Sequence, residues 1–161
     1  MDRDPIEQYA KGEEKLLLAI RGLTREDLVA PPDPDWNAGM WSIQQVVIHV
    51  ADTEQVYADR MKWVISEDNA PLPGFDQDKW AAALHYHDQS AEDAARIVEL
   101  TRKQMSAILR KLPDKSLTRT GQHSERGAMS VLDLVKYMVD HLERHVGFIH
   151  KKRAKMGKEM W

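Results

Sequence analysis

Four stretches of this sequence carry the signals with which amphipathic helices begin. Three of them open on a serine followed three residues later by a side chain that can complete the cap: Ser42, Ser90 and Ser130. The first stretch opens on Asp4, the expected N-cap, with Pro5 in the first helical position. Apolar residues then recur near the 3.6-residue period of a helix, and no segment alternates in the manner of a strand. The sequence therefore predicts an all-α protein built as a four-helix bundle.

The predicted connections between these helices are long for a bundle, in which loops of about 2–8 residues are usual. They cover residues 23–41, 68–89 and 113–129. Trp36, Trp80 and Tyr86 lie in them, and such large aromatic side chains favour packing against the bundle. Asp76 can cap a short helix within the second connection. We expect the connections to wall a pocket at one end of a single domain that spans residues 1–161.

The charge balance and the apolar segments argue against two classes of partner. The formal net charge of −3 lacks the basic excess of a nucleic-acid-binding protein. We interpret the basic residues 151–158 as cations that favour a helix C-terminus, with Gly157 ending the helix. No apolar run reaches the length of a membrane span, and the polar start MDRDPIEQ does not resemble a secretory signal. We therefore expect a cytoplasmic protein with neither a nucleic-acid partner nor a membrane partner.

The chain contains no cysteine, which restricts the chemistry of any metal site. A zinc–thiolate site and a thiol nucleophile supplied by the protein are both excluded. A bound metal ion would need ligands from histidine, aspartate or glutamate. Thiol chemistry would need a thiol carried by a substrate.

The segment DHLERHVGFIH places His141 and His145 one helical turn apart on an apolar face. Residues four apart on a helix have Cβ atoms about 6 Å apart, which suits two imidazoles that converge on one ion. The segment is not the zinc-protease motif H-E-x-x-H, because Leu142 takes the position of the glutamate. Glu143 points to roughly the opposite face of the helix and is not placed to act as the general base.

A third histidine, His49, lies on the apolar face of the second predicted helix. Three histidines facing the interior from two helices indicate a metal site with three ligands and an open position. Partly buried histidines with a structural role are the alternative interpretation. His85 and His87 are expected to be exposed in a connection, and His123 and His150 are given no role.

The segments WSIQQVVIHVADTE and SVLDLVKYMVDHLERHVGFI, with FDQDKW between them, resemble the DinB/YfiT-like superfamily. The resemblance covers most of the chain and implies a four-helix bundle. It also implies a divalent metal on three histidines, one from the second helix and two from the last, which here are His49, His141 and His145. Members include transferases that use low-molecular-weight thiols such as bacillithiol or mycothiol, and proteins labelled metal-dependent hydrolases. Many members form dimers, so a homodimer is implied.

A metal ion on three neutral imidazoles retains its full charge, which lowers the pKa of a bound water to about 7 or deprotonates a bound thiol. Zinc is the first candidate for the ion, and nickel is the second by analogy with the family. The sequence thus predicts a metal-dependent enzyme, either a thiol S-transferase or a hydrolase, that acts on a small molecule. A non-catalytic, metal-stabilised binding or stress-response module is the alternative.

Two residues share a helical face with the predicted ligands. Asp52 follows His49 by three positions, and its carboxylate could orient an imidazole by accepting the second ring N–H. Tyr137 precedes His141 by four positions and either lines the pocket or fills the core. The sequence does not identify a general base.

Overall fold

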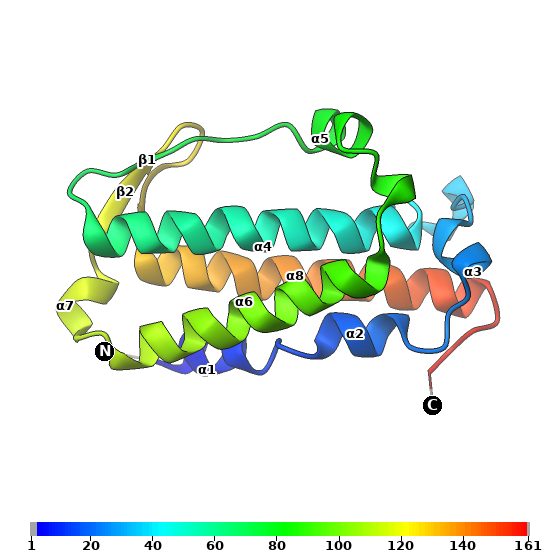
Figure 1. Ribbon diagram of the computed structural model, residues 1–161, viewed down its shortest axis with the longest axis horizontal. Coiled ribbons are helices and arrows are strands. Elements are labelled where there is room, and N and C mark those ends of the chain that lie inside the picture. The colour runs from blue at the N-terminus through cyan, green and yellow to red at the C-terminus, as the bar shows by residue number, and fades with distance from the viewer. Residues whose placement is uncertain (1–2, 161) are drawn as a thin grey trace.

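The computed structural model describes residues 3–160, and most of them are helical (Figure 1). The bundle consists of a first helix broken into α1 (Asp4–Ala10) and α2 (Lys15–Ile20), followed by α4 (Ile43–Ser66), α6 (Ala91–Lys111) and α8 (Val131–Lys155). The connections carry α3 (Arg25–Val29), η1 (Pro34–Trp36), β1 (Pro71–Leu72), α5 (Gln77–Ala83), η2 (Tyr86–Asp88), α7 (Asp114–Leu117), β2 (Thr120–His123) and β3 (Gly127–Ser130). The predicted four-helix bundle with long connections is confirmed. No helix among the described residues has the length and apolarity needed to span a membrane.

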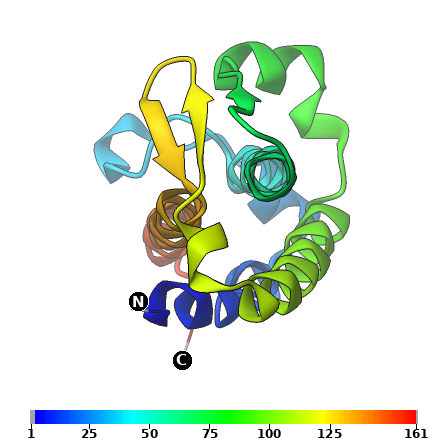
Figure 2. The ribbon, with the colours of Figure 1, turned by 90° about the vertical axis from the view of Figure 1, so that its left-hand side faces the viewer.

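The order of the helices explains the length of the second connection. α4 contacts α6 and α8, and the α1–α2 pair contacts the same two helices, so α4 lies diagonally opposite α1 and α2 (Figure 2). α4 and α6 are neighbours that run in the same direction (Figure 1). The segment that links the end of α4 to the start of α6 must therefore run back along the length of the bundle. Residues 67–90 do so over the outer side of α4 and carry β1 and α5 with them.

The starts of the long helices after the first follow the sequence signals. Ser42 and Ser130 each form a complete capping box. The serine hydroxyl accepts a hydrogen bond from the backbone N–H of the residue three positions later, and the side chain of that residue accepts one from the backbone N–H of the serine. Ser90 accepts a hydrogen bond from the backbone N–H of Asp93. Asp76 caps α5 in the same way, as predicted. These contacts are local, which is why the sequence reveals them.

The first helix differs from the prediction at its start and in its middle. It begins at Asp4 itself, with Arg3 as the N-cap and no side-chain cap, so the predicted aspartate cap is wrong. It then breaks into α1 and α2, because Gly12 lies against the buried guanidinium of Arg102. That guanidinium donates a hydrogen bond of 3.2 Å to the carbonyl oxygen of Tyr9, close to the end of α1. A contact with a residue so distant in the chain leaves no local signal.

Replacing Gly12 with alanine should destabilise the fold by about 1–3 kcal/mol, because overpacking forces buried neighbours to move. The new methyl group would overlap the Arg102 guanidinium and lie 2.8 Å from Cδ2 of Leu142. Gly147 in α8 is the matched control, since beyond its own helix a Cβ there meets no atom within 4 Å. Gly147→Ala should therefore stabilise the protein by up to about 1 kcal/mol. Urea unfolding measures both differences, and equal stability of the two variants would contradict the close packing at Gly12.

The core consists of two apolar clusters separated by a polar layer. One cluster surrounds the N-terminal half of α4 and the C-terminal half of α8, and the other surrounds the opposite halves of these helices. Buried polar side chains from α4, α6 and α8 lie in this layer, among them His49, Thr53, Glu54, Arg102 and His141. The middle of the bundle is therefore where burial and polarity coincide.

A small three-stranded sheet, which the sequence does not predict, joins the second and third connections. β1 pairs in parallel with β2, and β2 pairs with β3 in an antiparallel hairpin that turns through residues 124–126. Its strands have two to four residues, too few for alternation to be recognised. The hairpin lies beside α4 and α8, so segments of the second and third connections meet at this side of the bundle (Figure 2).

Candidate metal centre

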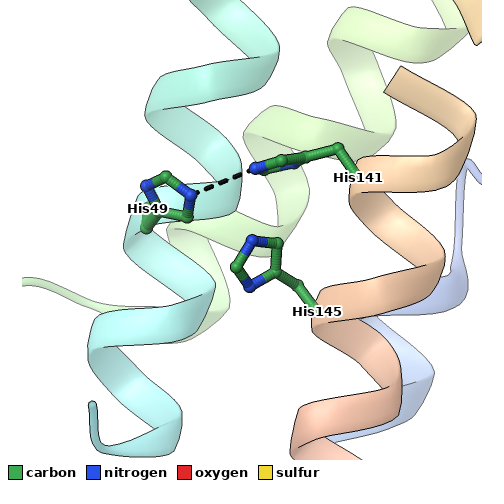
Figure 3. A group of neighbouring side chains, drawn as sticks. All are labelled: His49, His141 and His145. Carbon is green, nitrogen blue, oxygen red and sulfur yellow. Dashed lines mark hydrogen bonds between the residues drawn. The ribbon is translucent and has the colours of Figure 1, made fainter. Parts of the chain in front are cut away.

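Three histidines from two neighbouring helices meet inside the bundle. His49 lies on α4, and His141 and His145 lie one turn apart on α8, with their rings pointing toward one another (Figure 3). Nε2 of His49 lies 3.1 Å from Nε2 of His141. The centroid of the His145 ring lies 4.9 Å from that of His49 and 4.4 Å from that of His141. The structure thus brings together the three histidines that the sequence singled out.

Burial keeps these imidazoles neutral at pH 7. His49 and His141 are each 3% exposed, and their burial lowers the pKa of His49 to about 3 and that of His141 to about 2. Burial also lowers the pKa of His145 to about 4, and the nearby guanidinium of Arg144 contributes. The neutral ring is the form that binds a metal ion, because a protonated ring nitrogen has no free lone pair.

The donor atoms of the cluster fit a divalent ion. Nδ1 of all three rings is buried and has no hydrogen-bond partner among residues 3–160. The contact between the two Nε2 atoms satisfies one hydrogen bond at most, in which one ring donates. Two ligands of a tetrahedral zinc ion lie about 3.3 Å apart when each is about 2.0–2.1 Å from the metal. The observed spacing is close to that value, and an imidazole donor set suits zinc and nickel alike.

The histidines line a cavity of about 240 Å³ along the side of α4 and α8. The second connection contributes Phe75 and Gln77 to its wall, and the β2–β3 hairpin contributes His123 and Arg126. The second and third connections therefore wall a pocket as expected, whereas the first connection contributes no residue to its lining. The pocket lies on the flank of the bundle and not at its end, because the second connection crosses over α4.

The two residues expected to support the ligands lie in different surroundings. Tyr137 lines the cavity, and its ring centroid lies 5.9 Å from that of His141. The half-buried carboxylate of Asp52 accepts a 2.5 Å hydrogen bond from the hydroxyl of Tyr86. Burial raises the pKa of Asp52, while this hydrogen bond lowers it. Asp52 thus links the second connection to α4 through Tyr86, and Nδ1 of His49 donates no hydrogen bond to its carboxylate, so the expected orienting contact is absent among residues 3–160.

The remaining histidines divide between the surface and the cavity. His85 and His87 are exposed, as expected, and so is His150. His123 is 6% exposed and lines the cavity. The sequence pattern assigns no role to His123, because its strand is too short to be recognised.

Three further residues of α4 line the cavity on the face that carries His49: Thr53, Tyr57 and Arg60. They follow His49 by four, eight and eleven positions, which is the spacing of one helical face. The sequence pattern alone assigns none of these three residues to the site. The signal that could have found Arg60 is a cation at this spacing on an otherwise apolar face.

Three charged residues of α8, Glu143, Lys152 and Arg153, are not part of the cavity lining. Glu143 is exposed and pairs with Lys15 of α2, so it is not placed to act at the histidines. Lys152 and Arg153 lie in the last turn of α8, as interpreted from the sequence, and both are buried. The Lys152 ammonium donates to carbonyl oxygens of the first connection, and the Arg153 guanidinium donates to carbonyl oxygens at the end of α2. Gly157 follows the helix with a φ of +68°, as predicted for its end.

Comparison with known protein families matches residues 8–149 to the family described as the DinB superfamily. The chain belongs to this superfamily. The match includes α4 and most of α8, the two helices that carry the histidines. It confirms the resemblance drawn from the sequence segments around His49, His141 and His145.

Several curated relatives of this DinB-superfamily protein have names that refer to metal-dependent hydrolysis. Two proteins of Oceanobacillus iheyensis, each named "putative metal-dependent hydrolase", are 27% identical over 117 residues and 26% identical over 144 residues. These alignments cover 73% and 89% of this chain and 67% and 79% of the relatives. A protein of the same name from Geobacillus thermodenitrificans is 24% identical over 145 residues and covers 89% of this chain and 79% of its own.

The solved structure of YfiT from Bacillus subtilis has the same fold. It superposes with a TM-score of 0.87 over 98% of this chain and 90% of its own, at 20% sequence identity. YfiT is described as "a probable metal-dependent hydrolase with an unusual four-helix bundle topology". At this level of identity the similarity shows the fold alone.

Proposed function

We propose that this DinB-superfamily protein is a metal-dependent enzyme that hydrolyses a small molecule at an ion held by His49, His141 and His145. The observation that carries the proposal is a cluster of three neutral imidazoles, two buried and one partly buried, that lines a cavity. The names of the relatives refer to the same class of reaction and support it. Zinc is the first candidate for the ion and nickel is the second, because imidazole suits both.

A divalent ion bound by three neutral imidazoles lowers the pKa of a bound water to about 7 or deprotonates a bound thiol. The chain supplies the surroundings for this chemistry. Burial of His49 and His141 in the polar layer keeps bulk water from one side of the cluster. Thr53 lines the cavity one turn after His49, and its buried hydroxyl has no partner among residues 3–160. That hydroxyl is therefore available to bond to a bound substrate.

Transfer of a low-molecular-weight thiol to an electrophile is the second candidate reaction. The chain contains no cysteine, so an external thiol would meet no protein thiolate that competes for the ion. Thr53 and the three histidines would have the same roles in both reactions. The products separate the two reactions, since S-transfer leaves the sulfur of the thiol on the acceptor, whereas hydrolysis adds the elements of water across the cleaved bond.

Metal content and turnover of one preparation test this proposal. Protein made without a His-tag should contain, or take up, about one equivalent of zinc or nickel, because a preformed site holds its ion. Metal-loaded protein should hydrolyse members of an ester, amide and lactone panel, and metal-free protein should not. A thiol with an aromatic halide tests S-transfer in parallel. Metal content below about a tenth of an equivalent, with no uptake on titration, would refute both reactions.

A non-catalytic, metal-stabilised module makes a different prediction from the same preparation. It would take up the ion and melt at a higher temperature with it. It would show no metal-dependent turnover with any substrate of the two panels. A metal-dependent rate with any of these substrates rules the module out.

A further inference from the structure

The cavity beside the histidines carries more positive than negative charge. Arg60, Arg126 and Arg144 line it, against the single carboxylate of Glu125. Within residues 3–160, none of these arginines forms an ion pair with a carboxylate. A concave site with charges of one sign concentrates small ligands of the opposite sign.

Arg60 is the arginine whose charge most needs a partner, because its side chain is buried away from water. The residue is 4% exposed, and its guanidinium lies 4.5 Å over the ring of Tyr57. One Nη donates to the carbonyl oxygen of Pro73, while Nε has no hydrogen-bond partner among the described residues. Burying a charge is costly unless it is paired, so a buried guanidinium normally has a carboxylate beside it. A ligand that carries an anion would supply the missing partner.

Two side chains from the β2–β3 hairpin lie at the same end of the cavity. The guanidinium of Arg126 lies 4.6 Å over the ring of Tyr137, which stacks on Tyr57 at 4.7 Å with an angle of 10°. Arg60 and Arg126 therefore both contact one stacked pair of tyrosine rings. Nδ1 of His123 accepts a hydrogen bond from the backbone N–H of Glu125. In the neutral ring the proton is then on Nε2, which makes that atom a donor.

We propose that Arg60, Arg126 and His123 form a subsite for the oxyanion of a small substrate, either a carboxylate or a phosphate monoester. The planar fork of an arginine binds two oxygens of such a group at once. This subsite rests on the function proposed above, which places the reacting bond of the substrate at the histidine cluster.

The distance between the proposed anion subsite and the histidine cluster limits the size of the substrate. The ring of Tyr137 is near both: the guanidinium of Arg126 lies 4.6 Å over it, and the ring of His141 lies 5.9 Å from it. The proposed anion site and the reacting end therefore border the same aromatic ring. This is the span of a small metabolite, held by its charged group so that its reactive bond lies at the histidines.

Binding of matched six-carbon probes to the metal-free protein tests the subsite. Hexanoate and hexyl phosphate carry an oxyanion, and 1-hexanol has the same carbon chain without charge. The protein is kept metal-free so that neither anion binds to an ion at the histidines. Titrations followed by NMR should show that at least one anion binds about tenfold or more tightly than 1-hexanol, the usual effect of a charge-assisted hydrogen bond. The anion that binds identifies the group as carboxylate or phosphate.

Arg126→Met is the main variant, because Arg126 is exposed on the hairpin and its described contacts are with Tyr137. It should weaken anion binding about tenfold and leave binding of 1-hexanol unchanged. Arg60→Met should have the same effect, with thermal melting to check that it folds, since it also frees the carbonyl oxygen of Pro73. Arg96→Met removes an equal charge from the exposed face of α6, outside the cavity, and should change neither affinity.

The proposal is overturned if neither anion binds more tightly than 1-hexanol, or if Arg126→Met keeps the wild-type affinity for both anions. Neither result affects the uptake of zinc, so the subsite and the metal centre are tested separately. A protein that prefers the anions but takes up no metal retains the subsite and loses the proposed hydrolase function. A protein that takes up metal without preferring the anions retains the metal centre and loses the proposed subsite.

Discussion

The His141→Ala variant should gain no stability from zinc, whereas the wild-type protein should gain about 4 kcal/mol when free zinc exceeds its dissociation constant about 1,000-fold. In a chain of this length such a gain raises the melting temperature by about 8–16 °C. His141 is the informative position because its Nε2 lies 3.1 Å from Nε2 of His49, and its ring also lies beside that of His145. Its removal leaves two imidazoles from different helices, which is too few to hold zinc at that concentration.

The matched control for this variant is His150→Ala. His150 lies on the same helix but is exposed, so the wild-type response to zinc should persist. Thermal unfolding followed by circular dichroism, with and without zinc, measures the gain, and mass spectrometry counts the bound ions. Because His141 is buried, its replacement also lowers stability without zinc, and the comparison is therefore between gains. A gain in His141→Ala of more than half the wild-type value would place the ion elsewhere.

The features that the sequence predicts correctly depend on short-range contacts. A serine that caps a helix bonds to a residue three positions away, as Ser42, Ser90 and Ser130 do here. The position of His141 and His145 on one face of the helix follows from helical periodicity alone. Their meeting with His49 needs a further fact, that α4 and α8 are neighbours, which the resemblance to a family supplied and periodicity did not.

The features that the sequence misses depend on contacts between distant segments. The break in the first helix is set by Arg102, about ninety residues away, and Gly12 alone did not reveal it. Asp52 shares a face with His49, but periodicity does not show that Tyr86 packs against that face and donates a hydrogen bond to the Asp52 carboxylate. His123 reaches the cavity through a hairpin of four-residue strands, below the length at which a pattern is visible.

The buried ion pair between Arg102 and Glu54 joins the helices beside the histidine cluster. Arg102 of α6 donates at 2.9 Å to Glu54 of α4. Its other nitrogens donate at 3.2 Å to the carbonyl oxygen of Tyr9 in α1 and at 2.7 Å to that of Met138 in α8. The hydroxyl of Tyr9 donates to the other carboxylate oxygen of Glu54. Burial raises the pKa of Glu54, and the bonds from Arg102 and Tyr9 oppose this effect.

Arg102→Met should destabilise the protein by about 3–5 kcal/mol, because it leaves the Glu54 carboxylate buried without its counter-ion. Methionine keeps much of the volume, so the loss reports on charge and hydrogen bonding more than on a cavity. The shift of the urea midpoint measures it. Arg96, which pairs with Glu92 at 3.0 Å on the exposed face of α6, provides the control. Arg96→Met should cost less than about 0.5 kcal/mol, as exposed pairs on helices usually do.

The double variant Arg102→Met with Glu54→Leu separates the two explanations for such a loss. If the cost comes from an unpaired charge, removing the carboxylate as well should restore most of the stability, because apolar residues often replace a buried ion pair without loss. If Arg102 stabilises the bundle mainly through the carbonyl oxygens of Tyr9 and Met138, the double variant should stay as unstable as the single one. The described hydrogen bonds of Arg102 go to Glu54, Tyr9 and Met138 and not to a histidine, so folded Arg102→Met protein should keep the wild-type gain from zinc. A loss below about 1 kcal/mol in the single variant would show that the ion pair is not what joins the helices at this layer.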